Sequence, residues 1–407
     1  MLTKRIRIAI LVIAAGVIVV ALTAVVGHKK IERLMISQSM FSGADQVEHF
    51  RTMAQIFPAR AIAAAPQPRL FDAGEALPLP ETYDFNGQTR NTADFLDATD
   101  TTGFLVLKDS RIVYEKYWRG NDAGTHWISF SMCKSFVSAL IGIAVSEGAI
   151  ASINDPVTRY APELAGSAYD GVRIKDILQM SSGASWNEDY SDWNSDINRF
   201  GRTFAFGGSL DDFVKTLKPD HKPGTFNRYN SMDTQVLGLM LRHATGTSLT
   251  EYLAQKLWNP LGMESGVEWI TDDSGSEFAA GGLNATLRDY ARLGELYRNN
   301  GNWYGRQIVA ADWVRASVTP DAPHLMPGKR SNSDSTLGYG FQWWVPDERG
   351  DFSAIGIYNQ FVYVSADHHL VIAKTSANHH YGTTNGEASD HEDEHLALFR
   401  AIESRFR

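Results

Sequence analysis

The sequence predicts an α/β protein of the α+β kind, in which an antiparallel sheet built from both chain ends is flanked by helices. Short β-like runs occur near both ends of the chain, in residues 103–120 and again after Gly338. The stretch between them, from about 150 to 265, is mostly helical and loop-like, which indicates an inserted helical lobe. An apolar N-terminal run adds a predicted transmembrane helix.

Composition narrows the class of protein. The chain has 407 residues, of which 43% are apolar, and this is enough for two or more compact lobes. The formal net charge is −9, so no basic surface is expected and nucleic acid is not a predicted partner. Cys133 is the single cysteine, so no intrachain disulfide forms.

The N-terminal run, Ile8–Val26, contains Thr23 as its one polar residue and has basic residues on both sides. A bilayer core needs roughly 20 apolar residues in a helix, whereas the apolar part of a cleaved signal peptide is roughly 7 to 15 residues long. We therefore expect an uncleaved anchor that inserts residues 8–26 into the lipid bilayer. The rest of the chain would lie on the outer, periplasmic face of the inner membrane. The alternative is a cleaved signal and secretion to the periplasm.

The predicted organisation has four parts. Residues 1–30 form the membrane anchor or signal segment, and 31–75 form a helical stem and a linker. Residues 76–150 together with 270–407 form the sheet domain, and 151–269 form the mainly helical lobe.

Individual elements follow from local patterns. Residues 103–120 alternate around a polar centre and predict a β-hairpin. The long apolar run from Ser131 to Glu147 predicts a buried helix that Gly148 ends. Residues 284–299 predict a helix capped by Asn284. Four β-like runs and a last amphipathic helix then follow, with the sequences YGFQWWV, FSAIGI, QFVYVSA, HLVIAKTS and HLALFRAIESRF.

Ser131 and Lys134 form the one Ser-x-x-Lys in the chain, at the start of the predicted buried helix. Positions three apart lie on one face of a helix, so the lysine amine can reach the serine hydroxyl. The neighbours are apolar, including Met132 and Phe136, and a charged lysine is costly among them. A neutral amine can instead take the serine proton. The pair therefore predicts a nucleophile and its base, rather than a helix cap followed by a surface lysine.

Tyr229 follows a Pro-Gly turn and precedes an apolar helix, in PGTFNRYNSMDTQVLG. A tyrosine beside the serine and lysine can relay a proton to the leaving group. Taken alone, Tyr229 would be read as a core aromatic with a satisfied hydroxyl.

Over nearly all of residues 75–405, the sequence resembles the serine β-lactamase and penicillin-recognising superfamily. The likeness is to the branch of class C β-lactamases, carboxylesterases and 6-aminohexanoate-dimer hydrolases. Its markers are FSMCKSFVSALIG, INDPVTRYAPEL, IKDILQMSSG, PGTFNRYNSMDTQVLG, GGLNATLRDYARLGEL and YGFQWWV…AIGI. The serine at the third position of Tyr229-Asn230-Ser231 is most similar to the aminohexanoate-hydrolase branch. The resemblance implies a β-lactamase-like fold.

The resemblance also implies roles for particular residues. Ser131 would be the acylated nucleophile, Lys134 its base and Tyr229 the proton relay. The backbone N–H groups of Ser131 and Ile357 would form the oxyanion hole. The residues implied to contact substrate are Tyr190, Trp343 and Gly356. No metal and no cofactor is implied.

One departure from the family pattern bears on substrate. Ala354 and Ile355 stand where β-lactamases carry lysine and threonine, so a cation for the drug carboxylate is missing. We therefore predict hydrolysis of a small amide or ester. The alternatives are a β-lactamase or D-alanyl peptidase, and, from another class, a catalytically silent, membrane-tethered binding protein. The oligomeric state is not predicted.

A competing motif is HEDEH, residues 391–395, which fits the His-Glu-x-x-His signature of zinc proteases. On a helix, His391 and His395 would share a metal, with Glu392 as base. The surrounding acidic residues instead suit a solvated helix start. We predict no metal site here; added chelator would abolish a zinc protease and spare a serine hydrolase.

Overall fold

The computed structural model describes residues 45–384 and 386–406, together with residues 31, 33, 36 and 43. The predicted membrane segment, residues 8–26, lies outside these. Within the described residues, no helix combines the length and apolar character that a membrane crossing requires.

In the described part of the chain, the main sheet has eight strands and is built from both chain ends. In spatial order they are β12 (Gly338–Tyr339), β13 (Trp344–Val345), β14 (Phe352–Gly356), β15 (Gln360–Ser365), β16 (Leu370–Ser376), β5 (Thr101–Lys108), β6 (Arg111–Tyr117) and β2 (Asp72–Ala73). Antiparallel pairing holds from β12 to β6, but β2 runs parallel to β6. The predicted purely antiparallel sheet is therefore wrong at this edge, because β2 comes from the incoming chain and not from a hairpin.

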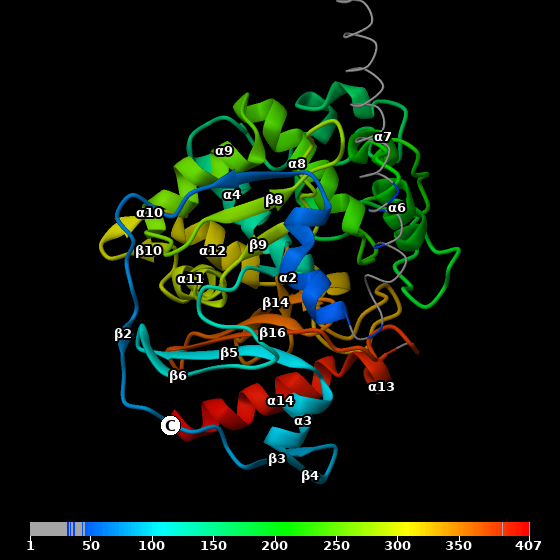
Figure 1. The fold of residues 1–407 in the computed structure, drawn as a ribbon. Coiled ribbons are helices and arrows are strands. Elements are labelled where there is room, and N and C mark those ends of the chain that lie inside the picture. The colour runs from blue at the N-terminus through cyan, green and yellow to red at the C-terminus, as the bar shows by residue number, and fades with distance from the viewer. Residues whose placement is uncertain are drawn as a thin grey trace, which may run out of the picture.

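Strand alternation gives this sheet two apolar faces. Leu105 and Leu107 of β5 join the larger core cluster, while Phe104 and Val106 join a second cluster. Helices α4 (Cys133–Ser146) and α11 (Leu287–Arg298) lie on the first side of the sheet, and α3 (Thr92–Ala98) and α14 (Glu392–Glu403) lie on the other (Figure 1). The sheet is thus a middle layer between two groups of helices.

A second, smaller sheet pairs β1 (Ala59–Ile62), β8 (Val267–Ile270), β9 (Leu283–Ala285) and β7 (Trp127–Ile128) in that order. Helix α2 (Gln46–Ile56) packs Phe50 and Met53 into the larger core. Residues 31–75 are predicted to form a helical stem and a linker, but within them α2 packs on the core, β1 pairs with β8 and β2 pairs with β6. The physical reason is that α2 carries a buried apolar face and β1 pairs fully with β8.

The remaining elements connect these layers. The helices are α5 (Ile174–Leu178), α6 (Asp196–Ala205), α7 (Leu210–Val214), α8 (Ser231–Thr245), α9 (Leu249–Leu253), α10 (Asn259–Leu261), α12 (Ala311–Val318) and α13 (Glu387–Asp390). Two small hairpins are β3 (Thr82–Phe85) with β4 (Gln88–Asn91), and β10 (Asn302–Trp303) with β11 (Arg306–Gln307).

Two local predictions need correction. The cap of α11 is Thr286, whose hydroxyl accepts a hydrogen bond from the Asp289 N–H, because Asn284 belongs to strand β9. The run YGFQWWV is not one strand. It folds back on itself as β12 and β13, with a turn in which Gln342 has a φ of 63°.

Candidate active site

Ser131 lies in the 3₁₀ turn Phe130–Met132, which leads directly into α4. Phe130 has a φ of 43°, a left-handed conformation that costs a bulky L-residue energy and is held by packing. Its ring packs against Phe50 and Tyr358, with centroids 4.9 and 5.3 Å away. Ser131 is 9% exposed and lines a cavity, so the strained turn presents a serine hydroxyl to a hollow.

Lys134 lies one helical turn later and is 2% exposed. Its Nζ is 2.7 Å from Ser131 Oγ, 3.2 Å from Ser231 Oγ and 2.9 Å from the Ala280 carbonyl oxygen. Burial lowers the pKa of Lys134 from 10.5 to about 8, and the nearby Glu188 carboxylate opposes this shift. With this pKa, roughly a tenth of the lysine is neutral at pH 7 and about half at pH 8.

The hydrogen bonds around Lys134 show which way the lone pair of its neutral amine points. A neutral amine has two N–H groups and one lone pair. The Ala280 carbonyl only accepts, and Ser231 Oγ donates its own proton to Glu188 Oε1 at 2.5 Å, so both take N–H bonds from Lys134. The lone pair then faces Ser131 Oγ, which is the orientation that proton abstraction requires.

Tyr229 immediately precedes α8, which Asn230 caps by accepting a hydrogen bond from the Met232 N–H. Its ring stacks on Trp344 with centroids 5.0 Å apart, and Lys134 Nζ lies 5.1 Å from the ring centroid. Burial, followed by the Glu188 charge, raises the pKa of Tyr229 well above its usual value, and a hydrogen bond with Ser131 opposes this. Tyr229 is therefore a protonated phenol within reach of the serine.

The sequence reasoning missed Glu188, although its charge acts on both Lys134 and Tyr229. Its carboxylate accepts hydrogen bonds from the Ser231 hydroxyl, from the Ser231 N–H at 3.1 Å and from the Tyr190 hydroxyl at 2.9 Å. Trp186 Nε1 donates to it as well. In the polar loop SSGASWNEDYSDWNSD, the one signal that sets Glu188 apart from its acidic neighbours is its position two residues from both Trp186 and Tyr190.

The predicted oxyanion region is brought next to the nucleophile. A Cβ on Gly356, at the end of β14, would lie 2.7 Å from the Ser129 carbonyl oxygen and 3.1 Å from the Ser131 nitrogen. Glycine is therefore required for the strand to approach the Ser131 backbone this closely. Ser131, Gly356 and Ile357 all line the same cavity.

Gln360, another residue that sequence reasoning missed, secures this region. Its Nε2 donates to the Ile357 and Tyr358 carbonyl oxygens at 3.1 and 3.0 Å, and its Oε1 accepts from Trp127 Nε1 at 3.1 Å. Trp127 lies four residues before Ser131 on the chain. One buried amide thus ties the turn that carries Ile357 to the strand that leads to the nucleophile.

The structure places Trp344 at the cavity, where the sequence suggested Trp343. Trp343, predicted to contact substrate, is fully buried against Tyr297 and Phe352. Trp344 lines the cavity instead. Successive side chains of an extended segment point to opposite sides, so a one-residue error in alignment moves the contact into the core. Tyr190, also predicted to contact substrate, lines the cavity.

The cavity itself has a volume of about 250 Å³. The described residues that line it are Ser131, Glu188, Asp189, Tyr190, Tyr229, Asp334, Ser335, Trp344, Ile355, Gly356, Ile357, Tyr381, Gly382, Thr384, Asp390 and Glu392. Five of these are acidic and none is a lysine or arginine. The side chains that line this cavity thus include several aromatic and acidic groups.

The HEDEH segment does not have the helical geometry that the zinc-protease signature requires. His391 has a φ of 52° and stands before the first residue of α14, so the two histidines are not one turn apart on a helix. The His395 ring is buried between Phe95 and Phe361. Glu387, His391 and Glu394 do come within 4.8 Å of one another. However, Glu387 caps the Asp393 and Glu394 N–H groups, and Glu394 is bound by Tyr83 and Arg90.

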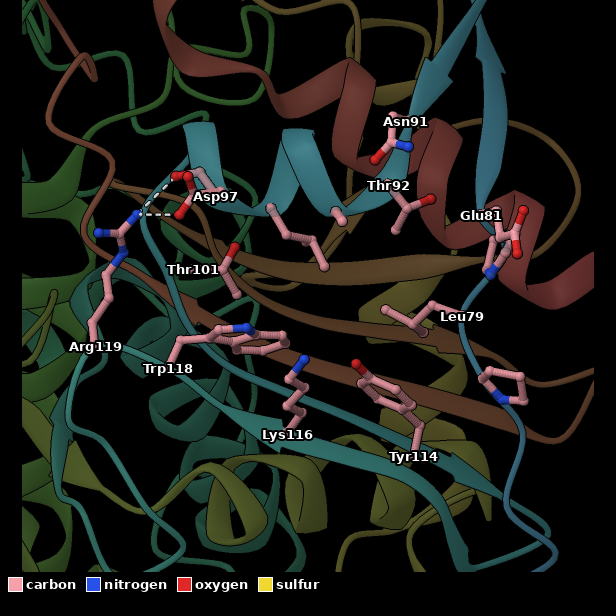
Figure 2. Close-up of a pocket in the computed structure, with 14 residues that line it drawn as sticks. Leu79, Glu81, Asn91, Thr92, Asp97, Thr101, Tyr114, Lys116, Trp118 and Arg119 are labelled. Atoms are coloured by element: carbon pink, nitrogen blue, oxygen red, sulfur yellow. Dashed lines mark hydrogen bonds and ion pairs between the residues drawn. The ribbon is translucent and has the colours of Figure 1, made fainter.

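A larger hollow of about 610 Å³ lies on the other face of the sheet, between α3, β6 and the segment before β3 (Figure 2). Trp118 and Tyr114 form its floor, and Lys116 projects between them. Ser131 is not among its lining residues. The size of a hollow is therefore no guide to the catalytic chemistry in this protein.

Comparison with known proteins adds three similarities. The family model described as Beta-lactamase matches residues 89–397. A 6-aminohexanoate-dimer hydrolase of Paenarthrobacter ureafaciens is 33% identical over 291 residues, which is 69% of this chain and 74% of that protein. A protein of Escherichia coli K12, provisionally assigned as a D-alanyl-D-alanine carboxypeptidase, is 24% identical and is matched over 58% of its length.

Solved structures show the same fold. A Bacillus anthracis protein provisionally assigned as a 6-aminohexanoate-dimer hydrolase superposes with a TM-score of 0.79 at 23% identity, covering 90% of this chain and 95% of that one. EstCE1, a hydrolase with promiscuous acyltransferase activity, superposes with a TM-score of 0.61 at 14% identity, covering 77% and 96%. These two similarities show that the chain shares their overall fold.

Proposed function

Because the chain belongs to the beta-lactamase family, we propose that it is a serine hydrolase that cleaves a small amide or ester bond through an acyl-enzyme on Ser131. The observation that carries this proposal is the 2.7 Å separation of Lys134 Nζ and Ser131 Oγ at the wall of a cavity. Nucleophile and base within hydrogen-bond reach, with the base oriented by further groups, is the arrangement that covalent catalysis needs.

Acylation begins when Ser131 Oγ attacks the substrate carbonyl carbon and its proton passes to the Lys134 lone pair. Glu188 and Ser231 position that lone pair by the hydrogen bonds described above. The carbonyl oxygen becomes an oxyanion, which the N–H groups of Ser131 and Ile357 stabilise. Two preorganised donors of this kind lower the barrier by several kcal/mol in acyl-transfer enzymes, at about 3 kcal/mol for each donor.

Breakdown of the intermediate expels an amine or alcohol, which must leave with a proton. Tyr229, a protonated phenol hydrogen-bonded to Ser131, delivers that proton and recovers one from Lys134. A water molecule then attacks the acyl-enzyme and the same groups act in reverse, which releases the carboxylic acid and restores the Ser131 hydroxyl.

The substrate preference follows from charge. In the described lining of the cavity there is no arginine or lysine to hold a carboxylate, and Ala354 replaces the lysine that β-lactamases use. Penicillin-like drugs and the D-alanyl ends of peptidoglycan both carry a carboxylate beside the scissile bond. A small amide or ester, in the manner of the 33% identical 6-aminohexanoate-dimer hydrolase, suits this cavity better.

A fluorophosphonate probe tests the proposal. Intact-mass spectrometry of the full-length protein should show one adduct, mapped to the peptide that contains Ser131, and none in Ser131→Ala. An adduct that persists in Ser131→Ala contradicts covalent catalysis at this residue, and absence of any adduct on the wild type favours a silent binding protein. Hydrolysis of p-nitrophenyl esters, linear aminohexanoate amides and nitrocefin then ranks the substrate classes.

We also propose that residues 8–26 anchor the protein in the inner membrane with the cavity on the periplasmic side. The apolar length of this segment supports an uncleaved helix. The mature protein should keep Met1 or Leu2 and stay in the membrane fraction after a carbonate wash. A mature N-terminus at or near His28 would instead identify a cleaved signal and a secreted enzyme.

A further inference from the structure

Two large aromatic side chains are exposed at the two ends of α6. Phe206 directly follows the helix and is 65% exposed, and Trp193, in the loop before the helix, is 68% exposed. Among the described residues, the exposed large apolar side chains are Ile31, Leu70, Trp193, Phe206, Tyr304 and Met326. Single exposed apolar residues are common, whereas apolar side chains that gather at one place mark an interaction surface.

Arg202 joins the two rings into one surface. Its guanidinium carbon lies 4.3 Å from the centroid of the Trp193 ring, and its Nη1 donates to the Trp193 carbonyl oxygen at 2.7 Å. Phe206 follows Arg202 by four residues, and its N–H donates to the Arg202 carbonyl oxygen at 3.0 Å, so both side chains lie on one face of the helix. We call Trp193, Arg202 and Phe206 the α6 surface.

The α6 surface carries a positive charge as well as aromatic rings. In the described part of the chain, Arg202 makes no ion pair, whereas Arg199 in the same helix is paired with Asp196 at 2.9 Å. The carboxylate of Asp273, close to the end of the helix, is likewise paired with Arg33, at 2.8 Å. These two acidic side chains are therefore neutralised, and the charge of Arg202 is available to a partner.

The chain enters the fold beside this surface. A Cβ on Gly207, the residue after Phe206, would lie 2.9 Å from Nη2 of Arg33, so the Arg33 side chain contacts the backbone next to Phe206. Ile31, two residues before Arg33, is 58% exposed. The N-terminal end of the described chain and the α6 surface thus lie next to each other.

The predicted membrane segment ends at Val26, seven residues before Arg33. An extended chain advances by at most about 3.6 Å per residue, so Arg33 lies within about 25 Å of the end of that segment. Tryptophan is enriched at membrane–water interfaces, and arginine is attracted to the phosphate groups of lipids. The α6 surface therefore has the chemistry of an interfacial contact and lies within reach of the bilayer.

We propose that the α6 surface docks on the lipid bilayer, with the rings of Trp193 and Phe206 at the boundary of headgroups and acyl chains and Arg202 against lipid phosphates. The inference rests on the proposed anchoring by residues 8–26, because the anchor brings this surface to the membrane. A second contact beside the anchor fixes the orientation of the catalytic domain, which the anchor alone leaves free to rotate.

This orientation places the catalytic cavity near the lipid surface. Trp193 lies three residues after Tyr190, which lines that cavity. Asn198 of α6 donates to the Tyr190 and Asp192 carbonyl oxygens at 3.1 and 2.9 Å, so the helix holds the loop between them. The docked enzyme would therefore take its amide or ester substrate close to the bilayer surface.

Spin labels on the full-length protein test this contact in vesicles of phosphatidylethanolamine and phosphatidylglycerol. Phe206→Cys carries the label within the α6 surface. Leu70→Cys is the matched control, because Leu70 is 66% exposed and lies just before β2, and β2 and α6 are at opposite edges of the molecule in Figure 1. The native Cys133 is completely buried and should stay unlabelled. Collision rates with oxygen, which concentrates in lipid, and with a water-soluble nickel chelate give the depth of each label.

The label at position 206 should lie about 5–10 Å deep in the boundary of headgroups and acyl chains, whereas the label at position 70 should report water. Adding Trp193→Ser and Arg202→Gln to the Phe206→Cys protein removes the ring and the charge beside the label. This change should return the label at position 206 to water while the protein stays bound to the vesicles.

Equal depths at positions 206 and 70, in a protein that floats with the vesicles, overturn the docking and leave the anchor intact. A depth at position 206 that survives the change of Trp193 and Arg202 also overturns it, because the α6 surface would not be what holds the label there. If the protein does not float with the vesicles, the anchor and the docking are both wrong. Labelling of Ser131 by fluorophosphonate is measured separately and decides the hydrolase function by itself.

Discussion

Two buried lysine–serine pairs in this protein have different surroundings. One is Lys134 with Ser131, and the other is Lys374 with Ser376. Lys374 and Ser376 are both completely buried in strand β16, and Lys374 Nζ donates to Ser376 Oγ. Burial lowers the pKa of Lys374 well below its usual value, as it does for Lys134. Only Ser131 of these four residues lines the cavity.

The comparison shows that a neutral buried lysine beside a serine is not by itself an active site. Lys374 has its remaining acceptor in the Asn359 carbonyl, 3.5 Å away, and among the described residues no phenol or carboxylate makes a hydrogen bond to it. The Asp100 carboxylate acts on Lys374 through its charge only. Lys134 has Ser231, the Ala280 carbonyl, Glu188 and Tyr229 around it, and its serine faces the cavity. Access to the cavity and the orientation of the lone pair distinguish a catalytic pair from a structural one.

The largest expected effect is the contrast between the two serines. Ser131→Ala should lower kcat/KM by about 10⁴-fold or more, because the nucleophile is lost. Ser376→Ala should keep the enzyme acylable but lower the free energy of unfolding by about 1–3 kcal/mol, because it leaves a buried amine short of a partner. Hydrolysis assays and urea unfolding of both variants check this. Equal activity losses would remove the distinction between the pairs.

The second-largest loss of activity is expected for Tyr229→Phe. It keeps the stacking on Trp344 and removes the proton relay that Lys374 and Ser376 lack. Loss of a positioned general acid–base group lowers kcat by about 10²–10⁴-fold. Esters with a good leaving group, such as p-nitrophenolate, need less help and should lose less than alkylamides. The same loss for both leaving groups would argue that Tyr229 has only a packing role.

A smaller effect is expected from Gln360→Leu. The variant frees the turn that carries Ile357 from Trp127 and so loosens one oxyanion donor without deleting it. Removal of a donor costs about 10²–10³-fold in kcat, and we expect about tenfold for a displaced one. Because the oxyanion exists only after attack, kcat should fall while KM stays constant. A change confined to KM would contradict this positioning role.

Much of the architecture was predictable from local patterns. The hairpin of residues 103–120 alternates around a polar centre, the helix behind Ser131 is one long apolar run, and the strands after Phe352 are short apolar runs. The edge strand β2 and the short β12–β13 turn were not predictable, because two-residue strands carry no periodic signal.

The residues of the candidate active site also divide into those that the sequence predicts and those that it does not. Ser131, Lys134 and Tyr229 were predictable because each occurs in a motif next to a helix start. Glu188 and Gln360 act through hydrogen bonds to residues on other elements, and such contacts leave no mark on the local sequence. Glu392 was missed because it lies in the HEDEH motif, which resembles a metal-binding signature. Trp343 was chosen in place of Trp344 because sequence similarity alone does not tell which side of an extended segment faces a cavity.

The central claim is that neutral Lys134 is the base for Ser131, and the pH dependence of the fluorophosphonate acylation rate tests it most directly. The lysine must lose its proton to act, and burial places its pKa at about 8, so the wild-type rate should rise as pH increases through that value. Lys134→Arg stays protonated and should lose about 100-fold or more, together with this pH limb. Lys374→Met is the control and should keep the limb at the same midpoint. A near-wild-type acylation rate in Lys134→Arg across this range, or a limb that disappears in Lys374→Met, would contradict the account.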